Sequence, residues 1–199
     1  MCGISGFFNS RSSLSKSEME SRISSMSMTL SHRGPDDYGI WVDQTVGVAL
    51  GHQRLSIVDL SAAGHQPMSS RDGRYVIVYN GELYNYKELR TQLSKNYKFY
   101  TSSDTEVLIK AYDYWNENCL NYLNGMFAFS IYDEVEKKLV LVRDRFGVKP
   151  LHYTIQDGVF YFSSEIKPLI EIKNNIKKNI NIYNSFFDEM ATDYNEETF

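Results

Sequence analysis

The chain has 199 residues, 42% of them hydrophobic and 14% aromatic, which is enough for one substantial buried core. Its net charge of −4, from 21 basic and 25 acidic side chains without a basic block, argues against nucleic acid or an anionic membrane as the main partner. No apolar run reaches the roughly 18 residues that span a bilayer, and no signal peptide precedes the globular pattern, so we expect a cytoplasmic domain.

Short strands and helices alternate along the chain. Ser15 and Glu18 form a capping box that opens the first helix, and two more helices are expected over 85–95 and 104–115. The expected strands are 3–9, 38–42, 46–50, 75–79, 126–132, 139–143, 151–155 and 159–163. The fourth of these strands is expected to end at the tight-turn pair Asn80-Gly81. Many short strands in hairpins with helices between them favour an α+β fold with antiparallel sheets.

Cys2 directly follows the initiator methionine. Aminopeptidases normally remove Met before a residue this small, which would give one residue both a thiol and a free α-amine. The thiol, with a pKa of about 8.5, is only slightly ionised at neutral pH, whereas an α-amine of pKa about 7.7–8.0 can take and return its proton. Cys2 is therefore a candidate nucleophile that carries its own base. By itself, a chance small residue at a frayed terminus explains the position better.

Three polar motifs follow strands or open helices. Arg54 follows an apolar strand and could bind a carboxylate bidentately, or form an ordinary surface pair. Asn80 and Gly81 offer two donors for an oxyanion hole beside the carboxylate of Glu82, or they only form a turn. Asp104 could be a ligand or merely a charge in the first turn of its helix.

The remaining titratable groups suggest no metal site. The four histidines are scattered without ligand spacing, and His52 and His65 are better explained as hydrogen-bonded structure than as catalytic bases. Cys119 is best explained as a half-buried structural thiol, and its distance in sequence from Cys2 fits neither a metal site nor a disulfide framework. We therefore assign no metal.

Together these groups fit glutamine as a substrate. A free amino-acid end needs an arginine for its carboxylate and an acid for its ammonium group. A carboxamide end needs a nucleophile and an oxyanion hole. Hydrolysis through a Cys2 thioester would release ammonia and then glutamate.

Eight runs occur in the order that characterises one enzyme family. They are Met1-Cys2-Gly3-Ile4, His32-Arg33-Gly34-Pro35-Asp36, Gly51-His52-Gln53-Arg54-Leu55-Ser56-Ile57-Val58-Asp59, Tyr79-Asn80-Gly81-Glu82-Leu83-Tyr84-Asn85, Ser103-Asp104-Thr105-Glu106-Val107, Gly125-Met126-Phe127-Ala128-Phe129, Arg143-Asp144-Arg145-Phe146-Gly147-Val148-Lys149-Pro150 and Phe162-Ser163-Ser164-Glu165-Ile166-Lys167. The chain resembles the class II glutamine amidotransferase domain of the glutamine-hydrolysing asparagine synthetases. The resemblance implies an N-terminal-nucleophile hydrolase fold, with two stacked antiparallel sheets between helical layers.

The resemblance also implies a role for each matched residue. Cys2 is the nucleophile, while the Asn80 side chain and the Gly81 N–H hold the oxyanion. Arg54 binds the substrate carboxylate, and Glu82 and Asp104 receive the ammonium group. The backbone of Ile57 and Val58 lines the carboxylate pocket. The loops 32–37 and 143–149 are interpreted as structural or interface-forming.

The expected amidotransferase domain covers residues 2–172, and 173–199 is expected to be a linker or the start of an absent synthetase domain. That domain would use ATP and magnesium to amidate aspartate, whereas the glutaminase step needs no cofactor. Two alternatives stay open: the acceptor could be a carboxylated sugar of a surface polysaccharide, or the chain could be a silent glutamine-binding scaffold, as it would be if Met1 were retained. A homodimer is also left open.

Overall fold

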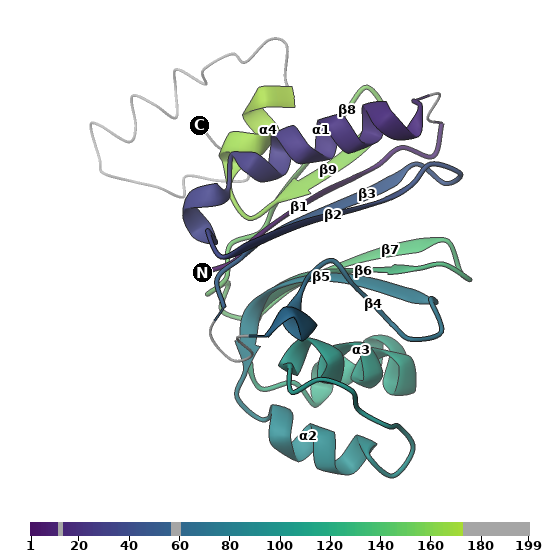
Figure 1. Ribbon diagram of the computed structural model, residues 1–199, viewed down its shortest axis with the longest axis vertical. Coiled ribbons are helices and arrows are strands. Elements are labelled where there is room, and N and C mark those ends of the chain that lie inside the picture. Colours follow the sequence, from purple (N-terminus) through teal and green to yellow (C-terminus); the bar gives the residue numbers. More distant parts are fainter. Residues whose placement is uncertain (12–13, 57–60, 173–199) are drawn as a thin grey trace.

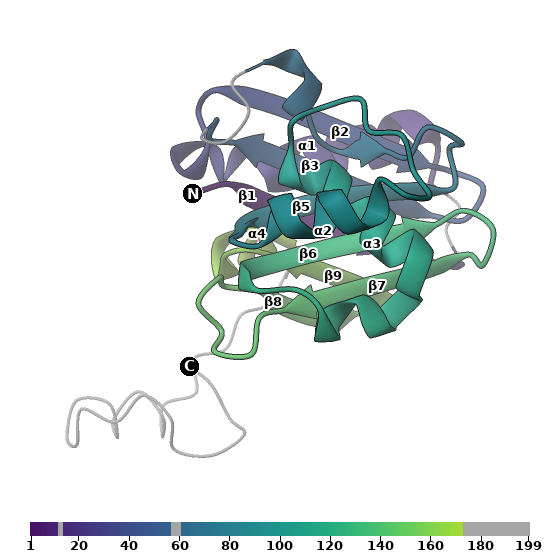
Figure 2. The same ribbon diagram turned by 90° about the horizontal axis from the view of Figure 1, so that it is seen from below.

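Two antiparallel sheets lie face to face, and helices cover both outer faces (Figure 1). The computed structural model describes residues 1–11, 14–56 and 61–172. Helices α1 (Lys16–Met28) and α4 (Ile166–Ile172) pack on the first sheet. Helix α3 (Asp104–Trp115) packs on the second sheet, and α2 (Tyr86–Leu93) packs on α3 (Figure 2). This layering confirms the expected α+β, N-terminal-nucleophile hydrolase fold.

The first sheet has the strand order β2-β3-β1-β9-β8. Its strands are β1 (Gly3–Phe8), β2 (Asp37–Asp43), β3 (Val48–Arg54), β8 (His152–Gln156) and β9 (Val159–Ser163). The start of the chain therefore occupies the centre of the sheet, where Gly3 lies opposite Gln53 and Ser5 lies opposite Ser163. The predicted capping box is present at Ser15, and the helix that it opens covers this sheet. Cys2 consequently lies at the end of a central strand.

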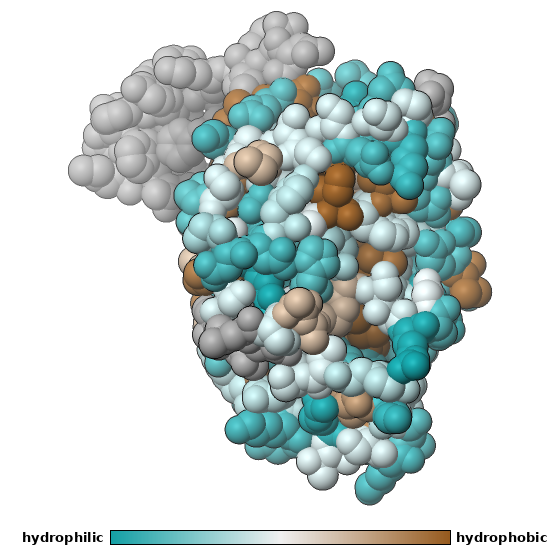
Figure 3. Space-filling model, in the orientation of Figure 1, coloured by the Kyte–Doolittle hydropathy of each residue, from teal (hydrophilic) through white to brown (hydrophobic). Residues whose placement is uncertain are grey.

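The second sheet has the strand order β4-β5-β6-β7. Its strands are β4 (Met68–Ser69), β5 (Tyr75–Leu83), β6 (Gly125–Asp133) and β7 (Lys138–Arg143). Side chains alternate along β5, so Ile77 and Tyr79 belong to the core beneath the helices, whereas Val76 and Val78 belong to the core between the sheets. Asn80 follows Val78 by two residues and therefore shares the face between the sheets. On the side of the molecule shown in Figure 3, where both sheets are seen edge-on, hydrophilic residues predominate and small hydrophobic patches lie among them.

One local expectation was wrong. Asn80-Gly81 does not end its strand in a turn: both residues lie within β5, where Asn80 pairs with Ala128 and Gly81 with Phe127 of β6. The ladder to β6 continues to Leu83, so long-range pairing overrides the local turn preference of this dipeptide. A side chain at Gly81 would clash with the carbonyl oxygen of Met126, so glycine serves close strand packing here.

Most other expected elements are present with boundaries shifted by a few residues. The short ones were not predicted: β4, α4 and the 3₁₀ turns η1 (Ser31–Arg33), η2 (Ala62–Gly64) and η3 (Asn116–Asn121). The segment 173–199 lies outside the described residues. Within the described ranges, no helix has the length and apolar character needed to cross a membrane.

A buried histidine joins the two sheets near one end of their interface. His52 of β3 is fully buried, and its Nε2 donates a hydrogen bond of 3.1 Å to the carbonyl oxygen of Tyr79 on β5. This confirms the structural interpretation of His52. The bond lies two residues from Arg54 and one residue from Asn80. It therefore fixes these two residues relative to each other across the sheet interface.

Candidate active site

One small cavity brings the predicted site residues together. It has a volume of about 80 Å³, and its lining includes Cys2, Arg54, Asn80, Gly81, Glu82 and Asp104. These residues come from the position just before β1, the end of β3, the end of β5 and the first turn of α3. Ile57 and Val58, expected to line the same site, lie outside the described residues. Met1 also lines the cavity, so its removal would enlarge the space.

The Cys2 thiol is held by backbone groups. The N–H of Leu55 donates to Cys2 Sγ at 3.4 Å, and the thiol reaches the carbonyl oxygen of Leu55 at 3.6 Å. Arg33 Nε donates to the Cys2 carbonyl at 3.0 Å, so the 32–37 loop holds the backbone of the candidate nucleophile. Burial raises the pKa of the thiol, whereas the Leu55 N–H and the nearby positive charges act in the opposite direction.

Asn80 presents a buried donor that the protein itself does not use. Its side chain is 1% exposed, and its Nδ2 has no hydrogen-bond partner within the described structure. A buried donor left unpaired costs about 1–3 kcal/mol, so such groups in native proteins call for an explanation. Because Asn80 lines the Cys2 cavity, an oxygen atom bound there would satisfy this donor. The geometry suits an oxyanion hole.

Arg54 is buried at the end of β3 and does not lie on the surface. It is 7% exposed, and its Nη1 donates to the Ser61 carbonyl at 2.9 Å. Gly64 lies directly against the guanidinium group, and a side chain at this position would clash with Nη2. The absence of a side chain at Gly64 therefore makes room for Arg54 to face the cavity.

Asp104 provides the opposite charge. Its Oδ2 accepts hydrogen bonds from the Tyr79 hydroxyl at 2.9 Å and the Leu83 N–H at 3.1 Å. Burial raises the pKa of this carboxyl, and the two donors oppose that effect. Ser103, not Asp104, caps α3, because its hydroxyl accepts from the Thr105 N–H. Asp104 is therefore fixed in the cavity wall and is not merely the cap of its helix.

Gln66 and Lys149 are among the polar lining residues that the sequence analysis did not assign to the site. Gln66 accepts a 2.7 Å hydrogen bond from the Tyr79 N–H and reaches Thr105 Oγ1 at 3.4 Å, which ties β5 to α3. Lys149 is 5% exposed and lines the cavity, although its loop was interpreted as structural. The only available signal was its place in the Arg-Asp-Arg-Phe-Gly-Val-Lys-Pro run, which carries a family resemblance but no role.

A family model described as a glutamine amidotransferase domain matches residues 1–198. The chain belongs to this family. It is 44% identical over 178 residues to asparagine synthetase [glutamine-hydrolyzing] 1 of Bacillus subtilis, covering 89% of this chain and 28% of that protein. It is 40% identical over 198 residues to the putative asparagine synthetase [glutamine-hydrolyzing] 2 of Methanocaldococcus jannaschii, covering 91% of this chain and 37% of that protein. The chain thus spans about a third of the length of these relatives.

The fold of the amidotransferase domain is also found in a solved structure. Glutamine phosphoribosylpyrophosphate amidotransferase from B. subtilis, complexed with ADP and GMP, superposes with a TM-score of 0.71 at 23% identity. The match covers 85% of this chain and 43% of that one. At this identity the likeness speaks for the fold alone.

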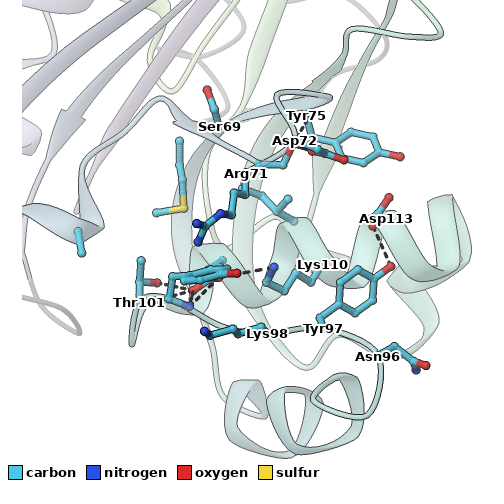
Figure 4. A pocket seen from close by; sticks show the side chains of 16 residues that line it. Ser69, Arg71, Asp72, Tyr75, Asn96, Tyr97, Lys98, Thr101, Lys110 and Asp113 are labelled. Carbon is cyan, nitrogen blue, oxygen red and sulfur yellow. Dashed lines mark hydrogen bonds and ion pairs between the residues drawn. The ribbon is translucent and has the colours of Figure 1, made fainter.

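The amidotransferase domain has a larger cavity on the other side of the first turn of α3. It has a volume of about 590 Å³ and lies between α3 and the segment that joins β4 to β5 (Figure 4). Its charged groups are largely engaged: the Tyr97 hydroxyl donates to Asp113 at 2.8 Å, and Glu106 accepts from the Thr101 N–H at 2.7 Å. No cysteine lines it. The smaller cavity at Cys2 is therefore the candidate reaction site.

Proposed function

We propose that this domain hydrolyses glutamine through a thioester on Cys2, and that the ammonia serves an ATP-dependent synthetase domain that converts aspartate to asparagine. The hydrolysis of glutamine is supported by one observation: a thiol, an unused buried donor and charges of both signs line the same cavity. The second half of the proposal is supported by relatives named asparagine synthetase that are 40–44% identical to this chain.

The proposed chemistry starts once Met1 has been removed and the α-amine of Cys2 is free. The amine takes the thiol proton as the sulfur bonds to the amide carbon of glutamine. The amide oxygen becomes negative and is held by the Asn80 side chain and the Gly81 N–H. Collapse breaks the carbon–nitrogen bond, and the α-ammonium returns the proton to the departing ammonia. Water, activated by the same amine, then cleaves the thioester and releases glutamate.

Charges of opposite sign orient the amino-acid end of the substrate. Arg54 would bind its carboxylate through two parallel hydrogen bonds, assisted by the backbone of Ile57 and Val58. Asp104 and Glu82 would receive its ammonium group. The hydrolysis uses only these protein groups and needs no cofactor.

The synthetase domain would supply the ATP and magnesium chemistry. We place the amidotransferase domain at residues 2–172 and the lead into the synthetase domain at 173–199. An apolar surface is available for such a partner, because Phe146 and Val148 are 93% and 55% exposed on the loop before Lys149. Because thiols stay reduced in the cytoplasm, we assign the reaction to that compartment. A homodimer stays a prediction.

Ammonia release from glutamine tests the proposal. We expect Cys2→Ala to abolish release while glutamine still binds, and Cys119→Ala, which removes a fully buried thiol outside the cavity, to retain it. Intact mass must first show that Met1 is absent from each sample. Ammonia release by Cys2→Ala equal to that of the parent chain would overturn the proposal. If the parent chain without Met1 bound glutamine but did not hydrolyse it, the silent glutamine-binding scaffold would be favoured.

The acceptor needs a separate assay. In the full-length protein, ATP-dependent amidation should occur with aspartate and not with a hexuronic acid. Amidation of the sugar alone would favour the polysaccharide alternative.

A further inference from the structure

Lys149 carries a buried charge for which the described structure offers no ion pair. It is 5% exposed, and its Nζ donates to the thioether sulfur of Met1 at 3.1 Å. Within the described ranges, no carboxylate lies at salt-bridge distance from it. A thioether is a weak acceptor, and buried ammonium groups are normally paired with a negative charge. Something else must therefore balance this charge when the site works.

The position of Lys149 is firmly fixed by its backbone. Asp144 accepts hydrogen bonds from the backbone N–H groups of Lys149 and Val148, both at 2.9 Å. The same carboxylate accepts from the N–H of Phe127 on β6 at 3.2 Å. Arg143 Nε donates to the Lys149 carbonyl at 2.8 Å. The loop is therefore tied to the second sheet and holds Lys149 in the cavity wall.

Cys2, whose thiolate is the nucleophilic form, lines the same cavity as Lys149. Burial lowers the pKa of Lys149, as does the charge of Arg33, while Cys2, Glu82 and Asp144 oppose this. The ammonium reciprocally lowers the pKa of the Cys2 thiol, as do the terminal amine and Arg54, which have the larger effects.

We propose that Lys149 acts electrostatically in catalysis: its buried ammonium stabilises the Cys2 thiolate. This inference rests on the proposed Cys2 mechanism and assigns it a further residue. It also explains why a cation that lacks an ion pair is tolerated in the wall of the cavity. Removing a buried charge that has no ion pair should stabilise the fold. Lys149→Met should therefore raise the melting temperature while lowering the reactivity of the Cys2 thiol.

The rate at which iodoacetamide alkylates Cys2 measures the fraction of the thiol that is ionised. The rate is followed against pH by mass spectrometry of the N-terminal peptide, on protein shown to lack Met1. We expect Lys149→Met to move the midpoint of this profile up by about one pH unit and to slow alkylation about tenfold below the midpoint. Lys149→Arg should leave the midpoint near that of the parent chain.

A matched control is available in Lys110, whose side chain is 14% exposed and pairs with Glu106 at 3.6 Å outside the Cys2 cavity. Lys110→Met should not move the midpoint. An unchanged midpoint in Lys149→Met would overturn the inference, as would an equal shift in Lys110→Met. If Lys149→Met fails to fold, Lys149→Gln takes its place in the same comparison.

The two proposals can fail separately. Alkylation needs no glutamine turnover, so ammonia release by Cys2→Ala would refute the nucleophile and leave the effect of Lys149 on the thiol measurable. Conversely, an unshifted alkylation profile would refute the role of Lys149 while the Cys2 mechanism stands.

Discussion

The stability of the domain should fall steeply as the pH drops from 6.5 toward 4, and His52 should be a main cause. His52 is fully buried between the sheets, and burial lowers its pKa from 6.5 to about 4, although the Tyr79 carbonyl opposes this by accepting its hydrogen bond. In the unfolded chain the imidazole binds a proton near pH 6.5, whereas in the folded state it stays neutral down to about pH 4. Its full contribution is therefore present above pH 6.5 and is lost as the pH falls through this window.

The size of the effect follows from the width of the window. Each pH unit in which only the unfolded state binds the proton costs about 1.4 kcal/mol of the free energy of unfolding. Between pH 6.5 and about 4 the loss attributable to His52 should approach about 3 kcal/mol.

The assay is urea unfolding at pH values from 7.5 to 4. The parent chain is compared with His52→Gln, whose amide can still donate to the Tyr79 carbonyl but does not titrate. Because other groups titrate equally in both proteins, the difference between the two curves isolates His52. His65→Gln is the matched control, since the side chain of His65 is 50% exposed and pairs with Asp37. Parallel curves for His52→Gln and the parent chain would refute the reasoning.

Three further predictions concern glutamine turnover. Gly64→Ala should push the Arg54 guanidinium away and raise the KM for glutamine about tenfold or more. The melting temperature should change little, because the clash is with the end of a flexible side chain. An unchanged KM would mean that another group holds the carboxylate of glutamine. Asn80→Ala should lower kcat about 100- to 1,000-fold with a smaller effect on KM, and Asn80→Gly should do no better, so near-parental kcat in the glycine variant would leave Asn80 purely structural. Since burial raises the pKa of Asp104, the KM should climb as the pH falls through this raised pKa, and Asp104→Asn should flatten the profile at a higher KM.

Local signals in the sequence predicted most of the elements. The capping box at Ser15 and the apolar spacing after it define α1, and Ser103 followed by acidic residues marks the start of α3. Hairpin strands were found because their apolar runs are bounded by turn residues. Elements of a few residues, such as β4, leave no periodicity to detect, and their positions depend on the strand that they pair with.

Long-range pairing explains what the sequence alone could not provide. Asn80-Gly81 has the local signature of a turn, and only the ladder to β6 shows that it continues a strand. Cys2, Arg54, Asn80, Glu82 and Asp104 were identified by chemical type and family resemblance, and the structure adds that they share a cavity. Lys149 could not be assigned, because burial without an ion pair is a property of the folded chain.

The central position of β1 has a consequence for the order in which the enzyme matures. The first strand to leave the ribosome needs β9 as its second neighbour, and β9 ends at Ser163. Until β9 has been made, the strand that follows Cys2 therefore has only β3 as a neighbour in its sheet. The topology thus places the completion of the sheet that carries Cys2 late in the synthesis of the domain, long after Cys2 itself has been made.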